Sequence, residues 1–169
     1  MVNVTFLNPF IEAVKDVVKA ELGIEVTRGP LSLQKSALTA DEVTVILSMV
    51  GEIQGVVLFG LSTQTALIMV EKMIGQKFTT FDNLAQSGIA ELGNVITGRA
   101  SINYSKAGYQ TNISPPTLIV GKGIQISTLD FSRIVVPMAT NMGELVVNLA
   151  LREATPGTEA PIPLAIGNK

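Results

Sequence analysis

Near the middle of this 169-residue chain lies the stretch Ser87-Gly88-Ile89-Ala90-Glu91-Leu92-Gly93-Asn94-Val95-Ile96-Thr97-Gly98. Its pattern is typical of a helix, yet it contains three glycines. A glycine in a helix interior costs roughly 1 kcal/mol relative to alanine, so three of them indicate that something approaches this backbone closely. We take this stretch as the best guide to the fold and to the function.

A helical wheel divides the stretch into two faces. At about 100° per residue, one arc of roughly 140° forms a predicted core face, and it contains Leu84, Gly88, Ile89, Leu92, Val95 and Ile96. An adjoining polar stripe contains Ser87, Glu91, Asn94 and Gly98. Because residues spaced three, four and seven apart share one side of a helix, a hydroxyl, a carboxylate, an amide and bare backbone should line up there. This stripe is a hypothetical contact surface, although Glu-x-x-Asn is common by chance and any surface helix shows a polar side.

The composition excludes several kinds of chemistry. The chain has neither Cys nor His, so a thiolate nucleophile, a Ser-His pair and a Cys/His zinc site are excluded. Any chemistry must therefore use carboxylates, amides, hydroxyls, Lys or Arg. The formal charge is -2, with no run of Lys or Arg and only two tyrosines to stack on bases, which argues against nucleic acid as a partner.

The hydropathy pattern argues against membrane insertion. Hydrophobic residues make up 47% of the chain, but apolar runs such as Ala66 to Val70 are far shorter than the roughly 20 residues of a spanning helix. No signal-peptide pattern opens the sequence. We predict one compact domain over residues 1–152, in the cytoplasm, followed by a tail over 153–169 that contains proline and glycine and is flexible, or that lies across a neighbour through its Ile162 to Ile166 patch.

Working outward from the central stretch, the sequence predicts helices that alternate with strands and hairpins. Helices are expected over 8–21, from Thr63 to about 74, and from about 80 to 107. Strands are expected over 24–26, 42–49, 55–61, 117–120, 123–128, 134–139 and 143–151, with hairpins at 50–53 and 140–143.

This order predicts an α+β fold, with a mostly antiparallel sheet and two long helices packed on it. Helix, strand and terminal hairpin occur twice, which indicates pseudo-duplicated halves. Pro137 inside a strand-like run predicts an edge or a bulge at that point. An exposed edge can pair with a second subunit, so joining of sheets in a homodimer is considered.

The central residues carry a resemblance to a known family. Ser87-x-x-x-Glu91-x-x-Asn94, with a proline a little over twenty residues later at Pro115 or Pro116, resembles the signature of the CheC/CheX/FliY chemotaxis phosphatases. The string from Glu91 to Gly98 is similar to that family's Glu-x-Gly-Asn-x-x-x-Gly pattern. Asn8-Pro9-Phe10-Ile11-Glu12, continuing to 21–26, is similar to the opening of the CheX branch. Together these matches span about residues 7 to 151.

The number of Glu/Asn pairs separates the branches of this family. CheC-type proteins typically carry the pair on two helices, but here Glu12 is followed three residues later by Lys15, so the single pair resembles CheX. The resemblance implies a CheC-like fold, a homodimer joined through sheet edges, and hydrolysis of the aspartyl phosphate on a CheY-like response regulator. It does not name the regulator or tell whether a CheD-type partner binds.

The resemblance also implies a role for each residue of the stripe. Asn94 would position the attacking water, and Glu91 would pair with the Lys beside the phosphorylated Asp of the receiver. Ser87 and Gly98 would support the helix or contact the partner. The receiver would supply the Mg²⁺, so that this protein would need no metal site and no cofactor of its own. A rival hypothesis is a non-catalytic module that binds a receiver or a flagellar partner without hydrolysis, and a third is an unrelated structural domain.

Overall fold

The structure is a computed structural model that describes residues 4–35, 37–128, 131–155 and 165–168. In these ranges the helices are η1 (Val4–Phe6), α1 (Leu7–Leu22), α2 (Thr63–Ile74) and α3 (Asn83–Lys106). The strands are β1 (Thr27–Arg28), β2 (Ser32–Gln34), β3 (Leu38–Thr39), β4 (Val43–Gly51), β5 (Ile53–Leu61), β6 (Thr111–Ile113), β7 (Thr117–Val120), β8 (Ile124–Ser127), β9 (Arg133–Thr140), β10 (Gly143–Glu153) and β11 (Ala165–Asn168).

Two hairpins form the centre of the main sheet. Within the described residues this sheet has eight strands, in the order β1-β9-β10-β5-β4-β6, with β2 also on β9 and β7 also on β4. Every pairing in it is antiparallel. The hairpins β4–β5 and β9–β10 meet along β5 and β10, where Val146 pairs with Gly60 and Glu153 with Ile53. The predicted α+β class with a mostly antiparallel sheet is therefore confirmed.

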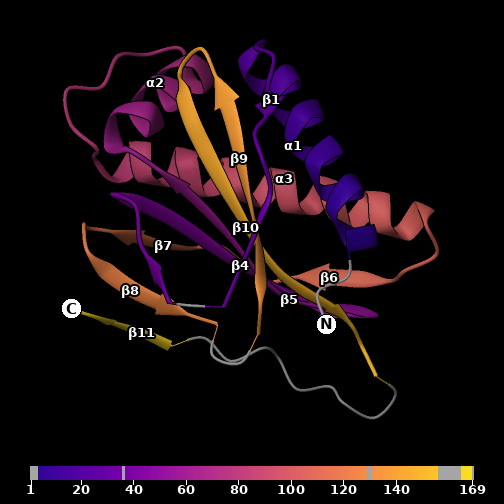
Figure 1. Cartoon of the computed structure of the whole chain (residues 1–169). Helices are drawn as coiled ribbons and strands as arrows, with labels where there is room; N and C mark the ends of the chain where they lie inside the picture. Colours follow the sequence, from indigo (N-terminus) through magenta and orange to yellow (C-terminus); the bar gives the residue numbers. More distant parts are fainter. Residues whose placement is uncertain (1–3, 36, 129–130, 156–164, 169) are drawn as a thin grey trace.

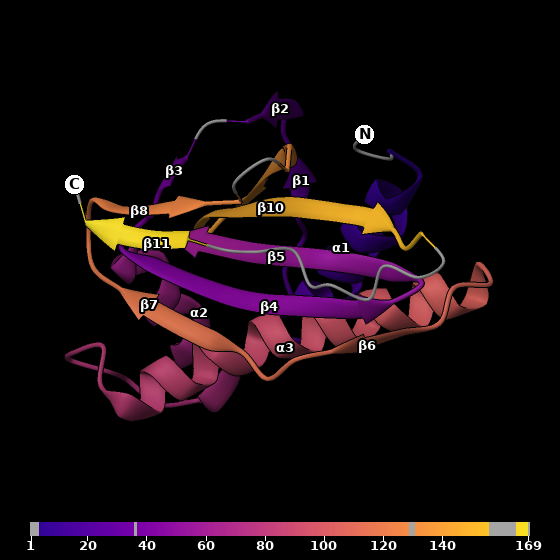
Figure 2. The same cartoon turned by 90° about the horizontal axis from the view of Figure 1, so that it is seen from below.

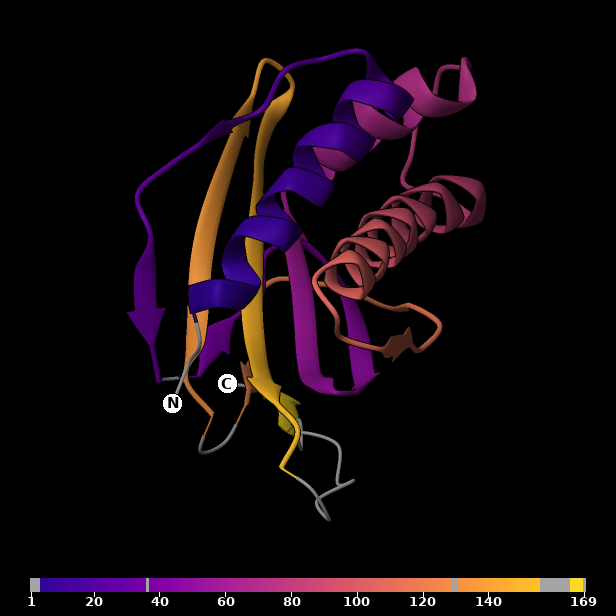
Figure 3. The same ribbon diagram turned by 90° about the vertical axis from the view of Figure 1, so that its right-hand side faces the viewer.

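The helices cover one face of this sheet, and a small second sheet covers part of the other (Figures 2 and 3). Successive side chains of β5 point to opposite faces of the main sheet. Val57 and Phe59 therefore belong to the core beneath the helices, whereas Val56 and Leu58 pack under the small sheet. The small sheet has the order β11-β8-β3. Because both faces are covered, every residue of β5 is buried.

The predicted duplication is visible in the order of elements (Figure 1). Each half runs from a long helix through short strands to a hairpin: α1 to β4–β5 in the first half, and α3 to β9–β10 in the second. The short strands are exchanged between halves, because β1 and β2 pair with β9 while β6 and β7 pair with β4. This exchange ties the halves into one sheet.

Helix boundaries follow local signals with one correction. Gly23 and Gly75 end α1 and α2 with φ of 67° and 78°, as expected for left-handed C-terminal glycines. Asp82 caps α3, where its Oδ1 accepts from the Ala85 N–H at 2.9 Å. The cap of α2 is Ser62 rather than the expected Thr63, and its Oγ accepts from the Thr65 N–H at 3.0 Å.

The predicted strand over residues 24–26 is wrong. The side chain of Val26 lies in the main core and that of Ile24 packs against it, but neither residue pairs with a strand. Pairing with β9 starts only at Thr27, opposite Ala139. The sequence analysis also missed β2, β3 and β6 as strands. These are two or three residues long, which is too short for a periodicity to be recognised.

Pro137 lies on β9 opposite a break in the edge strand. Its neighbour Met138 pairs with Arg28 of β1, whereas Val135 pairs with Ser32 of β2. Between the two strands, the Gly29 N–H donates to the Pro137 carbonyl at 2.7 Å. The strand β9 is therefore not an edge strand, as one form of the prediction had it, and the irregularity lies in the chain opposite Pro137, between β1 and β2.

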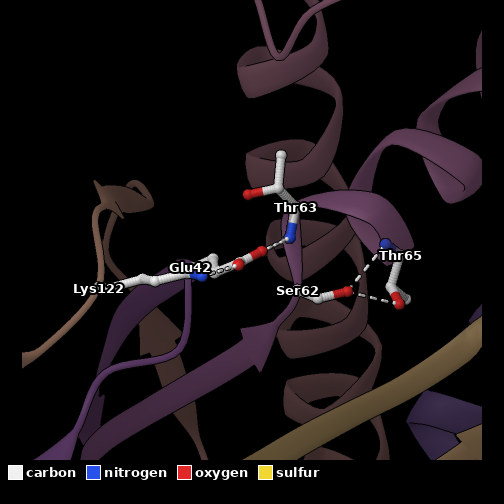
Figure 4. A network of polar contacts seen from close by, with 5 residues as sticks. All are labelled: Glu42, Ser62, Thr63, Thr65 and Lys122. Carbon is white, nitrogen blue, oxygen red and sulfur yellow. Dashed lines mark hydrogen bonds and ion pairs between the residues drawn. The ribbon is translucent and has the colours of Figure 1, made fainter.

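A carboxylate fastens the start of α2 to the loop between β7 and β8 (Figure 4). Glu42 Oε2 accepts from the Thr63 N–H at 2.7 Å, and Glu42 Oε1 lies 2.9 Å from Lys122 Nζ. The hydrogen bond to Lys122, followed by that to the Thr63 backbone, lowers the pKa of the Glu42 carboxyl from 4.5 to about 2. This network lies at the helix N-terminus, where a negative charge is stabilised by the helix dipole.

The predicted flexible tail is wrong for its last described part. Ala165–Asn168 form β11, which pairs with β8, with Ile166 opposite Ile126. Residues 156–164, which include most of the patch from Ile162 to Ile166, lie outside the described residues. The proposed domain boundary near residue 152 stays a prediction.

Candidate functional site

The longest helix, α3, carries every predicted site residue. Its 24 residues correspond to about 36 Å at 1.5 Å per residue. One side packs on α1, α2 and the main sheet, as Figures 2 and 3 show. Near its C-terminal end, the Asn103 amide donates to the Pro9 carbonyl at 2.9 Å and the Tyr104 hydroxyl to the Phe6 carbonyl at 2.6 Å. The helix is therefore held rigidly against the first half.

Two of its glycines have a packing role inside the chain. A Cβ added at Gly88 would lie 2.9 Å from Val70 Cγ1 of α2, and one at Gly93 would lie 2.9 Å from Val45 Cγ1 of β4. Both distances are shorter than real Cβ contacts. Gly88 thus permits close packing of two helices, and Gly93 permits close packing of helix on sheet.

Gly98 differs from these two glycines. The nearest atom to an added Cβ would be Ile113 Cδ1 of β6, at 3.9 Å, which is ordinary contact distance. Packing inside the described part of the chain therefore does not require a glycine at this position. An added Cβ at Gly98 would therefore meet no crowding beside the polar stripe, and a role of this glycine in contact with a partner stays a prediction.

The polar stripe faces solvent on the outer side of α3. Ser87 and Glu91 are exposed, and Asn94 and Gly98 are half-buried. The Asn94 Nδ2 lies 3.5 Å from Glu91 Oε2, at the limit of a hydrogen bond. The carboxylate and the amide are therefore adjacent, yet only weakly engaged with one another and open to a partner.

One border of the stripe is formed by the chain that follows α3. Ser101 Oγ lies 3.1 Å from the Thr111 carbonyl, to which it donates. Pro115 and Pro116 connect β6 to β7, and β7 begins at the next residue, Thr117. The predicted strand over residues 117–120 is confirmed, and it follows the two prolines directly.

Thr97 has a structural role. Its Oγ1 donates to the Gly93 carbonyl at 2.8 Å, and the side chain is buried. Bonding of a helix hydroxyl to the preceding turn is common. Thr97 is therefore not part of the exposed site, although it is adjacent to Gly98 in sequence.

The predicted core face needs one correction. Ile89, Leu92 and Ile96 are buried as expected, but Leu84 is 49% exposed. The sequence analysis also overlooked Ile102, which is 53% exposed on the same helix. The wheel contained a signal for both, since Leu84 precedes Glu91 by seven residues and Ile102 follows Gly98 by four.

The described residues contain no group of three or more His, Cys, Asp or Glu side chains that could hold a metal ion. The candidate site instead consists of a carboxylate, an amide and a hydroxyl, all of which act by hydrogen bonding or charge. None of the described helices is both long and apolar enough to cross a membrane.

The family follows from comparison with known sequences. The sequence model of the family described as chemotaxis phosphatase CheX matches residues 43–139, which is more than half of the chain. The chain belongs to the CheX family. The match extends from β4 to β9 and includes the whole of α3 with its Glu91/Asn94 pair.

Individual relatives agree with this assignment. The chain is 29% identical over 123 residues to the CheY-P phosphatase CheX of Thermotoga maritima, covering 72% of this chain and 79% of that protein. The crystal structure of a CheC-like superfamily protein from Shewanella sp. PV-4 matches with a TM-score of 0.80 and 27% identity, over 89% of this chain and 99% of the other.

A third relative was solved together with its partner. The CheX–CheY complex of Borrelia burgdorferi, which contains beryllium fluoride and magnesium, matches with a TM-score of 0.68 and 23% identity, over 89% of this chain and all of the other. These comparisons confirm the predicted family, the CheC-like fold and membership of a family of phosphatases, which are hydrolases.

Proposed function

We propose that this protein hydrolyses the aspartyl phosphate of a phosphorylated CheY-like response regulator. The observation that carries this proposal is the Glu91/Asn94 pair, in which Glu91 is exposed and Asn94 half-buried, next to the clearance at Gly98 on the longest helix of a CheX-family chain. The relative from Thermotoga maritima is a CheY-P phosphatase, which supports this substrate.

In this proposal Asn94 positions the attacking water. Phosphoryl transfer passes through a loose transition state, so catalysis consists largely of alignment and charge stabilisation. The amide of Asn94 accepts from and donates to one water and holds it in line with the phosphorus. The water oxygen forms the new bond to phosphorus, the bond to the aspartyl oxygen breaks, and the proton lost by the water ends on the released phosphate. The products are inorganic phosphate and the free carboxylate of the receiver.

Glu91 fixes the register between the two proteins. Its carboxylate lies one turn before Asn94 and is exposed, so it can form a charge-assisted hydrogen bond with a Lys of the receiver beside the phosphorylated Asp. We favour this docking role over that of a general base, because a solvent-exposed carboxylate is a weak base at neutral pH.

Ser87 and Gly98 have supporting roles in the proposal. Ser87 is exposed one turn before Glu91 and contacts the partner at the edge of the interface. Gly98 lets the partner's backbone approach α3 beyond Asn94, because a Cβ is missing where the helix surface is open. The Mg²⁺ that neutralises the phosphoryl oxygens belongs to the receiver, in keeping with the magnesium in the Borrelia burgdorferi complex.

The decisive experiment measures phosphate release from a CheY-type receiver phosphorylated with a small-molecule phosphodonor in the presence of Mg²⁺. We expect Asn94→Ala to lower the rate by about 100-fold, because removal of one positioning group typically costs a few kcal/mol of transition-state stabilisation. Asn8→Ala is the control, since Asn8 is also an asparagine with solvent access on a helix, but it lies on α1. A parental rate in Asn94→Ala would contradict the mechanism.

The same measurement separates the rival function. A non-catalytic binding module would leave the lifetime of the phosphorylated receiver unchanged, or would lengthen it, at concentrations where the two proteins bind. Faster release by the parent and not by Asn94→Ala favours the phosphatase.

We also infer a homodimer joined through a sheet edge. The main sheet ends at β1 and β2 on one side and at β6 and β7 on the other. Beside β2, exposed Val4, Leu31 and Leu33 line a groove of about 280 Å³ together with Leu7, Ser32 and Ile134. An open edge next to apolar side chains favours pairing with a second copy.

The dimer is tested by sedimentation of the parent and of Leu33→Lys. We expect the parent to sediment as a dimer at micromolar concentration and the variant to shift toward monomer, because a charge beside the edge opposes strand pairing. Val50→Lys is the control, since Val50 is exposed away from this groove. A parent that is monomeric at this concentration would contradict the inference.

A further inference from the structure

We propose that Leu84 and Ile102 are apolar docking residues that clamp the receiver on both sides of the Glu91/Asn94 pair. This inference rests on the proposed function and extends it, because it names the side chains that determine affinity for the partner. Both side chains are about half exposed, at 49% and 53%.

Their positions on α3 are the first support. Eighteen residues separate Leu84 from Ile102, which is five turns of 3.6 residues, so the two side chains point the same way. Glu91 lies within about 20° of the same direction on the helical wheel. The line through the two apolar side chains therefore passes close to Glu91, whereas Asn94 lies about 80° from it on the wheel, on the side of the polar stripe.

The spacing is the second support. At 1.5 Å per residue, Leu84 and Ile102 are about 27 Å apart along the helix, close to the diameter of a small domain. The centre of this span falls between residues 92 and 94, where the pair lies. A receiver domain centred on the pair can therefore reach both apolar side chains at once.

The core does not account for either side chain. Neither Leu84 nor Ile102 belongs to the two buried clusters or to the partly buried residues packed against them. In contrast Val95, on the same helix, packs against the main cluster. Replacing an exposed apolar residue by a polar one should therefore change stability little.

The flanking arrangement also explains how the pair can work at an exposed surface. When the receiver covers Leu84 and Ile102, these contacts exclude water from the rim of the interface, and hydrogen bonds at its centre become stronger. Gly98 lies one turn before Ile102, so its clearance lets the partner come close enough to bury that side chain.

The test compares Leu84→Gln and Ile102→Gln in steady-state hydrolysis of a phosphorylated CheY-type receiver. Glutamine keeps a high helix propensity. We expect each variant to raise KM by about 3- to 10-fold, since burial of half a leucine or isoleucine side chain is lost. We expect kcat to stay at the parental value, because the Glu91/Asn94 pair is intact. The control is Ile68→Gln, which alters an exposed isoleucine on another helix, α2.

Binding of the receiver activated with beryllium fluoride and Mg²⁺ gives a second readout. It is measured in an Asn94→Ala background, and the same 3- to 10-fold loss of affinity is expected for both substitutions. Unchanged KM and unchanged affinity in both variants would overturn the docking role, even if Asn94→Ala slows hydrolysis as the proposed function requires. If the unsubstituted protein does not hydrolyse the receiver phosphate, the proposed function is refuted. The binding measurement still decides the docking role in that case. If a glutamine variant unfolds, Leu84→Ser and Ile102→Ser give the same comparison.

Discussion

Helices α1 and α3 occupy corresponding places in the two halves, but their surfaces differ. The buried residues of α1 are all apolar, and its exposed positions are polar, charged or alanine. In α3 the buried residues include Gly93 and Thr97, while Leu84 and Ile102 face outward. Packing alone therefore accounts for the pattern of residues on α1. On α3, by contrast, exposed apolar side chains are present that the core does not use.

The largest expected effect comes from changing the same residue type on each helix. Glu91→Ala should lower kcat/KM for the phosphorylated receiver by about 10- to 100-fold, because a charge-assisted hydrogen bond worth about 1.5–3 kcal/mol is lost. Glu12→Ala should leave kcat/KM unchanged, although Glu12 is also exposed. The kcat/KM of both variants is measured from phosphate release under steady-state conditions. Equal losses in the two variants would contradict a special role of α3.

The two sides of α3 should respond in opposite directions to an added methyl group. Gly93→Ala should lower the free energy of unfolding by about 1–2 kcal/mol, because overpacking against Val45 and Phe59 exceeds the gain in helix propensity. Gly98→Ala should raise that free energy by about 0.5–1 kcal/mol. It should nevertheless reduce kcat/KM about tenfold, because the methyl group displaces the partner. Urea unfolding and turnover of the same two variants test this, and a destabilised Gly98→Ala would contradict it.

A surface carboxylate outside α3 should affect stability and not turnover. The folded-state pKa of Glu42 is about 2, below its ordinary value of 4.5. Its stabilising contribution is therefore present above pH 4.5 and is lost as the pH falls toward 2. We expect Glu42→Gln to have a lower Tm than the parent at pH 7, the two to converge near pH 2, and kcat/KM at pH 7 to be unchanged. A constant difference in Tm at all pH values would contradict this linkage.

The smallest expected effect is that of building a second Glu/Asn pair on α1, which should not change phosphate release. Lys15→Asn creates a Glu12-x-x-Asn pair on α1, but in an Asn94→Ala background it should restore no phosphate release. Lys19 follows Glu12 by seven residues, as Gly98 follows Glu91, and its side chain forms an ion pair with Glu25 where the partner would need clearance. Recovery of activity by the double variant would show that the dipeptide spacing alone suffices.

Most elements of the fold were predictable from local sequence signals. The glycines after α1 and α2, the aspartate before α3 and the two hairpins act on residues within a few positions of themselves. The short strands were not predictable. A strand of two residues such as β1 exists because Arg28 lies opposite Met138, more than a hundred positions away.

The candidate site was predictable in its polar part only. Glu91 and Asn94 share a stripe because of helix geometry, which the sequence contains. Leu84 was wrongly predicted to be buried, because on the wheel it lies at the border between the core face and Glu91, and neighbouring elements decide whether such a border position is covered. The two roles of the glycines likewise depend on Val70, Val45 and Ile113, which come from three other elements.

The sequence by itself determined the order of helices and hairpins, the single Glu91/Asn94 pair and the resemblance to one family. These depend on interactions within a few residues and on spacing along one helix. Only the tertiary structure decided that Gly88 and Gly93 pack closely against other elements while Gly98 does not. It also decided that Leu84 and Ile102 stay exposed. The physical reason is that burial is set by whichever distant segments pack against a surface, and a local pattern does not contain them.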